Sequence, residues 1–279
     1  MIFATRFAPS PTGYLHRGHA FSALTAFQAA QDADGRFVLR IEDIDATRSR
    51  PEHEAAILED LAWLGLSWEQ PVRRQSEHLA DYHAAIETLR GRGLVYRCFK
   101  TRKELDIGRA PHEPAVAYRG APLPPAEEAE RLARGEAFAW RLSLNAAEAA
   151  LGGFENLSFA EEGFGPDGET GLIQARPETA GDIVLARKDV GVAYHLAVVL
   201  DDALQGVTHV IRGVDLFEAA HIQRLLQALL GLPTPIYRHH RLLTGPDGKR
   251  YAKRDKAQTL RELRTAGVTA EALRAELGF

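Results

Sequence analysis

The sequence predicts an α/β fold in which a parallel sheet carries helices on both faces. Residues 2–8 and Phe37–Glu42 have the composition of buried strands, and an apolar helical pattern over 18–33 connects them. Strand, helix and strand in this order open a βαβ unit, which is the building block of parallel sheets. Strand-rich sequence returns after residue 179, so the sheet is expected to come from two separated parts of the chain.

The first part of the sheet domain is expected to span residues 1–98. Helices are predicted at about 51–65, with Pro51 in a favourable first-turn position, and at about 76–93. A third strand is predicted at 94–98. Because ligands of such sheets gather at the carboxyl ends of strands, the segments after residues 8 and 42 are the first places to look for a site.

Residues 99–178 differ in character and are predicted to form an inserted, smaller α+β domain. They contain a proline-rich segment at 121–125, a charged helical pattern at 126–135, a short strand pattern at 137–142 and glycine-rich turns around 152–153 and 163–171.

The second half of the sheet domain is expected at 179–232. Strands are predicted at 182–187, 193–202 and 207–215, followed by a helix at 217–230 that ends at Gly231. Residues 233–279 are predicted to hold a loop at 244–256 and two short helices, at about 259–266 and 270–277.

Composition limits the classes of protein that fit this chain. It has 279 residues, 45% hydrophobic and 26% charged, which is ordinary for a soluble globular protein. No apolar run approaches the ~20 residues of a membrane span, and one cysteine excludes an internal disulfide framework. The net charge of −4 means that any nucleic-acid contact must come from local basic patches. We expect a cytoplasmic monomer.

The strongest local motif is Arg-Phe-Ala-Pro-Ser-Pro-Thr-Gly-Tyr-Leu-His-Arg-Gly-His at residues 6–19. It breaks the first strand into a tight loop and begins a helix near His16–His19. A helix N-terminus favours an anion such as phosphate, and two histidines there can add hydrogen-bond donors. The alternative for a bare His-x-Gly-His is a strand–loop–helix corner with two surface histidines.

A second motif is the basic loop Gly-Lys-Arg-Tyr-Ala-Lys-Arg-Asp at residues 248–255. Basic side chains on a mobile loop can neutralise a leaving pyrophosphate, although a lone run of charges is usually a solvated turn.

Together the two motifs resemble the "HIGH" and "KMSKS" signatures of class I aminoacyl-tRNA synthetases in the form found in glutamyl and glutaminyl enzymes. Lys253 matches the second lysine of the second motif, whereas Arg250, Tyr251 and Ala252 depart from it, and the usual serine hydroxyl is absent. The resemblance extends to residues 40–45, 194–202 and 209–215. It implies a Rossmann-like catalytic domain.

The resemblance also implies a set of substrate contacts. Glu42 would bind the ammonium of L-glutamate, Arg6, Tyr194 and Arg212 its carboxylates, and Ser10 and the backbone around Ala8 would help to seat it. The carboxylate of glutamate would attack the α-phosphate of ATP, giving glutamyl-adenylate and pyrophosphate. His16, Gly18 and His19 would hold the ATP phosphates and Lys253 the departing pyrophosphate. Magnesium is expected on the ATP oxygens, without a dedicated protein cage.

A zinc site is not expected. Related short enzymes carry Cys-x-Cys after the third strand and then Tyr-x-x-x-Cys, but this chain keeps only Cys98. A structural zinc needs four ligands, and His112 could replace only one. Cys98 is instead expected to be a small buried residue.

The chain stops at Phe279, about one helical hairpin after the second motif, so an anticodon-binding domain is not expected. It thereby resembles short members of the family that attach glutamate to queuosine in the anticodon loop of tRNA(Asp). Phosphate contacts to that tRNA are assigned, from charge alone, to Arg17, Arg238, Arg241, Lys249 and Arg254.

Three alternatives stay open at this point. A truncated glutamyl-tRNA synthetase would charge the 3′ end of tRNA(Glu), and a non-catalytic paralogue would only bind tRNA or glutamate. Another nucleotidyl transferase could share His-x-Gly-His, but it would not need the glutamate pocket.

Overall fold

The central feature of the computed structural model is an arrangement of two neighbouring groups of parallel strands. The structure describes residues 2–105, 117–187, 191–243 and 258–279. Strands β1 (Ala4–Phe7), β2 (Arg36–Ile41) and β3 (Arg73–Arg74) are parallel in that order, and β10 (His209–Gly213) runs parallel to β11 (Ile236–His240).

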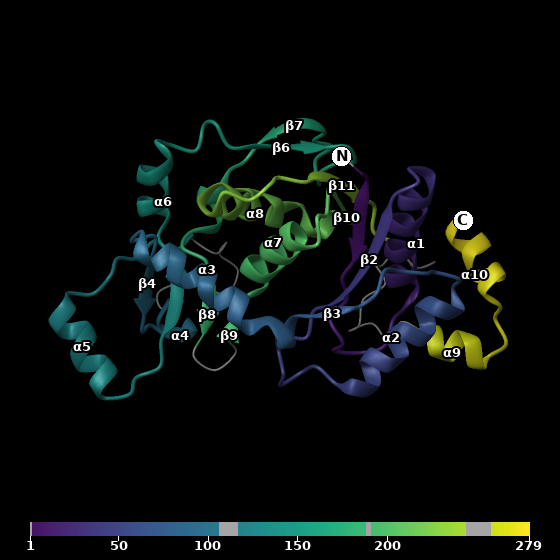
Figure 1. The fold of residues 1–279 in the computed structure, drawn as a ribbon, viewed down its shortest axis with the longest axis horizontal. Coiled ribbons are helices and arrows are strands. Elements are labelled where there is room, and N and C mark those ends of the chain that lie inside the picture. The colour runs from purple at the N-terminus through teal and green to yellow at the C-terminus, as the bar shows by residue number, and fades with distance from the viewer. Residues whose placement is uncertain (1, 106–116, 188–190, 244–257) are drawn as a thin grey trace.

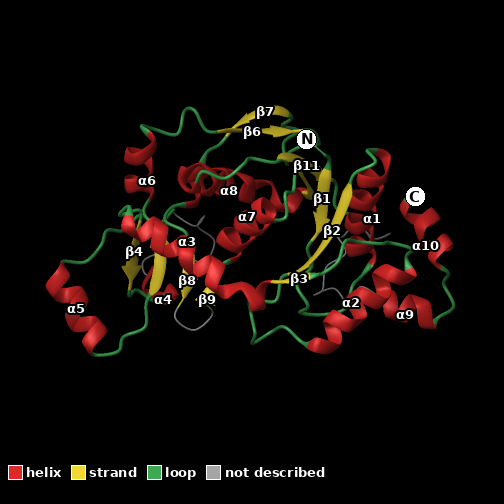
Figure 2. Cartoon of the chain, viewed as in Figure 1, coloured by secondary structure: helices red, strands yellow, loops and turns green. Residues whose placement is uncertain are grey.

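Figure 2 shows β1 beside β2, and the two halves of this arrangement meet between β1 and β10. The Ala4 N–H donates to Thr208 Oγ1 at 2.8 Å, and the Thr208 N–H donates to the Ala4 carbonyl at 2.9 Å. Ala4 and Thr208, which are 204 residues apart in the sequence, therefore lie side by side. Two separated parts of the chain thus contribute parallel strands that lie next to each other.

Helices cover both faces of these strands. Val210 packs in a core with α7 (Tyr194–Leu204) and α8 (Phe217–Leu230). The neighbouring Ile211 packs in a second core with α1 (Arg17–Asp32) and α2 (Pro51–Trp63). Because successive side chains of a strand point to opposite faces, these contacts place the two helix groups on opposite sides.

Local rules predicted most helix ends. α2 begins with Pro51, and α8 ends at Gly231, whose φ of 66° is left-handed. Helix α3 (Leu79–Gly91) follows a 3-10 turn at Gln75–His78, and the two together span 75–91, where a helix at about 76–93 was predicted.

The prediction of a strand at 193–202 was wrong, because these residues form helix α7. Residues 196–200 are apolar at every position, and nearly every side chain from Leu196 to Asp202 is buried, so the segment shows neither the period of a strand nor that of a surface helix.

A separate antiparallel sheet has the order β4-β5-β8-β9. It consists of β4 (Val95–Cys98), β5 (Ala139–Leu142), β8 (Val184–Arg187) and β9 (Gly191–Val192). The third strand expected in the first half of the sheet domain is β4. It instead pairs with β5, from within 99–178. The same segment holds α4 (Arg102–Leu105), α5 (Pro125–Ala133) and α6 (Leu144–Leu151).

A hairpin from the segment 99–178 reaches the parallel strands. Strands β6 (Ser158–Glu161) and β7 (Gly171–Gln174), which the sequence did not predict, pair antiparallel, and Glu161 lies beside Tyr237 of β11. The pairing places Glu161 within hydrogen-bond distance of His239 in β11.

The C-terminal helices pack against the first motif (Figure 1). Helices α9 (Leu260–Thr265) and α10 (Ala270–Leu277) follow a bridge between Thr259 and His16, and the Leu260 N–H donates to the Leu15 carbonyl at 2.8 Å. No helix in the described part of the chain is long and apolar enough to cross a membrane.

Candidate active site

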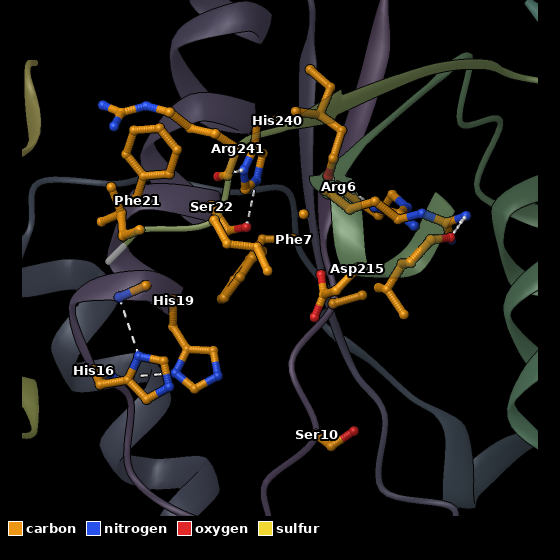
Figure 3. A pocket seen from close by; sticks show the side chains of 18 of the residues that line it. Arg6, Phe7, Ser10, His16, His19, Phe21, Ser22, Asp215, His240 and Arg241 are labelled. Atoms are coloured by element: carbon orange, nitrogen blue, oxygen red, sulfur yellow. Dashed lines mark hydrogen bonds between the residues drawn. The ribbon is translucent and has the colours of Figure 1, made fainter. Parts of the chain in front are cut away.

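A cavity of about 590 Å³ opens at the carboxyl ends of the parallel strands. The loop after β1, the end of β2, the first residue of α7 and the segments after β10 and β11 contribute to its wall. This is where the strand order predicts a ligand site. Figure 3 shows His16 and His19 across the cavity from Arg6 and Asp215. Predicted site residues that line it are Arg6, Ala8, Ser10, His16, Gly18, His19, Glu42, Tyr194, Arg212 and Arg241.

The two histidines form the N-terminal cap of α1. His16 Nδ1 accepts from the Gly18 N–H at 3.1 Å, and His19 Nδ1 accepts from the His16 N–H at 3.2 Å. Their rings stack with centroids 3.8 Å apart. Because Nδ1 accepts a hydrogen bond in both rings, the ring N–H proton of each histidine is on Nε2. Both Nε2 atoms are therefore hydrogen-bond donors beside the helix N-terminus. This arrangement suits an anionic ligand.

A buried ion network lies beneath the opposite wall. Asp202 accepts from Arg6 at 3.1 Å and from Arg40 at 2.9 Å, and Arg40 is fully buried. Burial alone would raise the pKa of Asp202, but Arg6 and Arg40 lower it overall. Arg40 is therefore a structural ion-pair residue, whereas Arg6, with the same partner, also lines the cavity.

Glu42 is the buried carboxylate of the cavity. It is 8% exposed, and both of its contacts with Arg40 use Oε1, at 3.2 and 3.4 Å. Within the described residues, Oε2 accepts no hydrogen bond. Burial raises the pKa of Glu42 despite the nearby Arg40 and Arg6 guanidinium groups. A bound cation would stabilise its charged form.

Arg212 lies at the end of β10 and is 5% exposed. Its Nε donates to His239 Nε2 at 3.0 Å, Nη1 to Gln223 Oε1 at 2.9 Å and Nη2 to the Leu216 carbonyl at 2.9 Å. A guanidinium has five N–H donors, so these bonds leave two for a ligand.

The sequence did not predict one end of the cavity, formed by Phe21, Ser22, Asp215, His240, Leu242 and Leu243. His240 Nδ1–H donates to the Arg241 carbonyl at 2.9 Å, which leaves Nε2 to accept from Ser22 Oγ at 2.7 Å. The sequence did contain a signal that Phe21 and Ser22 line the cavity. They stand three and four residues after Gly18 and thus on its face of the helix.

The predicted tRNA contacts are not brought together in the described part of the chain. Arg241 lines the cavity over the Phe21 ring, with 5.6 Å between guanidinium carbon and centroid. Arg17 bonds to Glu276 at 2.7 Å and Arg238 to Glu162 at 2.6 Å. The loop residues Lys249, Lys253 and Arg254, and also His112, lie outside the described residues.

Cys98 is buried, as predicted. Among residues 2–105, 117–187, 191–243 and 258–279, no group of three or more His, Cys, Asp or Glu side chains could hold a metal ion.

Comparison with known proteins gives the family. The family model for the catalytic domain of class I tRNA synthetases (E and Q) matches residues 3–278, nearly the whole chain. The chain belongs to this family. Membership confirms the predicted enzyme class, and a class I synthetase uses ATP as a substrate.

Two relatives show where the chain falls within the synthetases. It is 47% identical to the glutamyl-Q tRNA(Asp) synthetase of Rhodobacter capsulatus, and the match covers 99% of both chains. It is 40% identical to glutamate–tRNA ligase 2 of Dinoroseobacter shibae, but it covers only 59% of that protein.

Solved synthetase structures confirm the fold class. A glutamate tRNA ligase from Elizabethkingia meningosepticum, in complex with its amino acid, superposes with a TM-score of 0.76 at 30% identity. The glutamate–tRNA synthetase from Elizabethkingia anophelis gives 0.77 at 29%. The match covers 91% of this synthetase chain and about half, 52 and 53%, of theirs.

Proposed function

We propose that the protein activates L-glutamate with ATP and transfers it to queuosine in the anticodon loop of tRNA(Asp). The observation that carries this proposal is the end-to-end match with the Rhodobacter glutamyl-Q tRNA(Asp) synthetase. The cavity supports it, since one buried carboxylate and two arginines are the groups that an amino acid with two carboxylates requires.

Glutamate would lie between Glu42 and the two arginines. Its ammonium would bind Glu42 Oε2, and its two carboxylates would bind the remaining donors of Arg6 and Arg212. Tyr194, Ser10 and Ala8 line the same cavity, and the first two side chains with the Ala8 backbone would orient the molecule. An amide in place of the side-chain carboxylate would leave an arginine charge unpaired, which disfavours glutamine.

ATP would place its phosphates at the N-terminus of α1. His16 and His19 Nε2–H would donate to the phosphate oxygens, and Gly18 would let the backbone approach. Lys253 and a magnesium ion on the phosphates would stabilise the departing pyrophosphate. Leu243 lines the cavity and Thr259 bridges to His16, so described residues on both sides of Lys253 in the sequence lie near the site, which supports this proposed role.

The tRNA would approach the open side of the cavity. Arg241 is the described residue best placed to meet a phosphate there, while Arg17 and Arg238 would have to share their charge with Glu276 and Glu162. Lys249 and Arg254 remain proposed contacts from the same basic loop.

Charging of tRNA(Glu) is the second candidate function, supported by the 40% identity to a glutamate–tRNA ligase. Attachment of labelled glutamate to total tRNA from queuosine-containing and queuosine-deficient cells separates the two. The proposal predicts label on tRNA(Asp) only when queuosine is present. Label on tRNA(Glu) regardless of queuosine would overturn it.

A further inference from the structure

Arg212 is held by a chain of buried groups that reaches beyond the cavity. The Arg212 Nε–H donates to His239 Nε2 at 3.0 Å. On the other side of the ring, His239 Nδ1 lies 2.6 Å from Glu161 Oε2. The side chains of His239 and Glu161 are 0% exposed. Neither residue lines the cavity.

The hydrogen-bond partners determine where the proton of His239 lies. Arginine nitrogens can only donate, so Nε2 of His239 must accept from Arg212. The single proton of a neutral imidazole is then on Nδ1, from which it donates to Glu161. Burial lowers the pKa of His239 and so favours this neutral ring.

Glu161 is built to stay charged in this position. Its Oε1 accepts from the backbone N–H groups of His239 and Gly163, both at 2.8 Å. Burial alone would raise its pKa, but the hydrogen bonds from His239 and Gly163 lower it overall. Gly163 permits this packing, because a Cβ there would lie 2.0 Å from the His239 carbonyl oxygen.

We propose that Glu161 and His239 are positioning residues that orient the Arg212 guanidinium for a carboxylate of the amino-acid substrate. Glu161 fixes the Nδ1–H tautomer of His239, and His239 Nε2 then fixes the Nε edge of Arg212. Arg212 Nη1 is also bonded to Gln223 and Nη2 to the Leu216 carbonyl. The guanidinium plane is therefore fixed, and so is the direction of its two remaining N–H donors. The inference rests on the proposed glutamate site.

The arrangement makes Glu161→Gln a sharp test. Two backbone donors face Oε1, so the amide oxygen must take that place and the NH₂ group must take the place of Oε2. His239 Nδ1 would then have to accept, which moves the ring proton to Nε2. That proton would face the Arg212 Nε–H, and two donors would oppose each other.

The experiment compares Glu161→Gln with Glu87→Gln in glutamate-dependent pyrophosphate exchange with tRNA present. Glu87 is exposed, pairs with Arg90 in its own helix and does not line the cavity, so it serves as the matched control. We expect the KM for glutamate to rise about tenfold in Glu161→Gln, the equivalent of one hydrogen bond to a charged group. The KM for ATP and kcat should change less than about twofold, because the nucleotide end is untouched.

A glutamate KM that stays near that of wild type, or a parallel rise of the KM for ATP, would overturn the inference. ¹⁵N NMR of the imidazole rings provides a second measurement, which tests the position of the His239 proton directly. Wild type should show His239 as the Nδ1–H tautomer, and Glu161→Gln should shift it to Nε2–H. If the variant does not fold, a wild-type His239 ring protonated on Nε2 would still refute the arrangement.

The failure of the proposed substrate can be told apart from the failure of this inference. If the wild type exchanges pyrophosphate with another amino acid but has the Nδ1–H tautomer of His239, the proposed substrate is wrong and the positioning of Arg212 is not.

Discussion

At the scale of single residues, the site depends on charges that the protein has removed from water. Glu42 and Asp202 are both buried beside Arg40, but their pKa values shift in opposite directions. Asp202 receives two guanidinium groups at hydrogen-bond distance, and Glu42 bonds to one. Asp202 is thus satisfied by the protein itself, and Glu42 still has capacity for a positively charged ligand.

The raised pKa of Glu42 predicts a specific pH dependence. Protonation removes the charge that would bind the ammonium group, so kcat/KM for glutamate should fall as the pH drops through this pKa. Because the pKa is raised, the fall should begin above the pH at which an ordinary glutamate titrates. Glu42→Gln should raise the KM for glutamate roughly 10- to 100-fold and abolish this acid limb. Pyrophosphate-exchange rates across pH measure both effects, and an unchanged acid limb in Glu42→Gln would assign it to another group.

Asp202→Asn should mainly affect stability. It leaves two buried guanidinium groups without their shared counter-charge, which costs about 3–5 kcal/mol for a broken buried pair. Urea unfolding measures the loss. Asp81→Asn is the matched control, because Asp81 pairs with Arg73 at an exposed position and should change stability by less than about 0.5 kcal/mol. Equal effects of the two substitutions would refute the argument.

At the scale of elements, the contact between α2 and α9 contains an unsatisfied acid. Asp60 of α2 is 0% exposed, and neither carboxylate oxygen has a hydrogen-bond partner among the described residues. Arg264 of α9 is 3.7 Å from Oδ1, beyond hydrogen-bond distance. Burial therefore raises the pKa of Asp60, and the nearby Arg264 offsets this rise only in part. The resulting pKa is about 6.

Asp60→Asn should stabilise the protein at alkaline pH. The folded state holds the Asp60 proton more tightly than the unfolded state, so the stabilising contribution of this residue is complete below its unfolded pKa of 3.8 and disappears as the pH rises through about 6. Replacing the acid with a neutral amide should increase the free energy of unfolding by on the order of 1 kcal/mol at pH 8 and change it little near pH 4. Melting curves at both pH values test this, and a gain independent of pH would point to a different cause.

The elements also show what a sequence can and cannot predict. The cap of α1 at His16 and the cap of α8 at Gly231 follow from residues within one turn of each helix end, so they could be predicted. The helical form of α7 could not, since its apolar run is buried on all sides. Most cavity residues were predicted because they stand in contiguous motifs, whereas His239 lies 27 and Glu161 51 residues from Arg212, outside any shared local pattern.

At the scale of the whole molecule, Thr208 joins the two halves of the parallel strands. Its Oγ1 accepts the Ala4 N–H at 2.8 Å between β1 and β10. Thr208→Val keeps the shape but leaves a part-buried donor unsatisfied, so we expect a loss of about 1–3 kcal/mol in unfolding free energy. Thr88→Val is the control, because among the described residues the Thr88 hydroxyl bonds only to the Ala84 carbonyl in its own exposed helix turn. A loss of similar size in both variants would contradict a joining role for Thr208.

The packing of the C-terminal helices on the first motif has a consequence for how the protein is made. Leu15 and His16 leave the ribosome long before Leu260 and Thr259, the residues to which they bond. Domains begin to fold during synthesis, and contacts distant in sequence form late. The phosphate-binding corner is therefore among the first parts to be translated and among the last to be completed, so an interrupted nascent chain would carry the motif without its support.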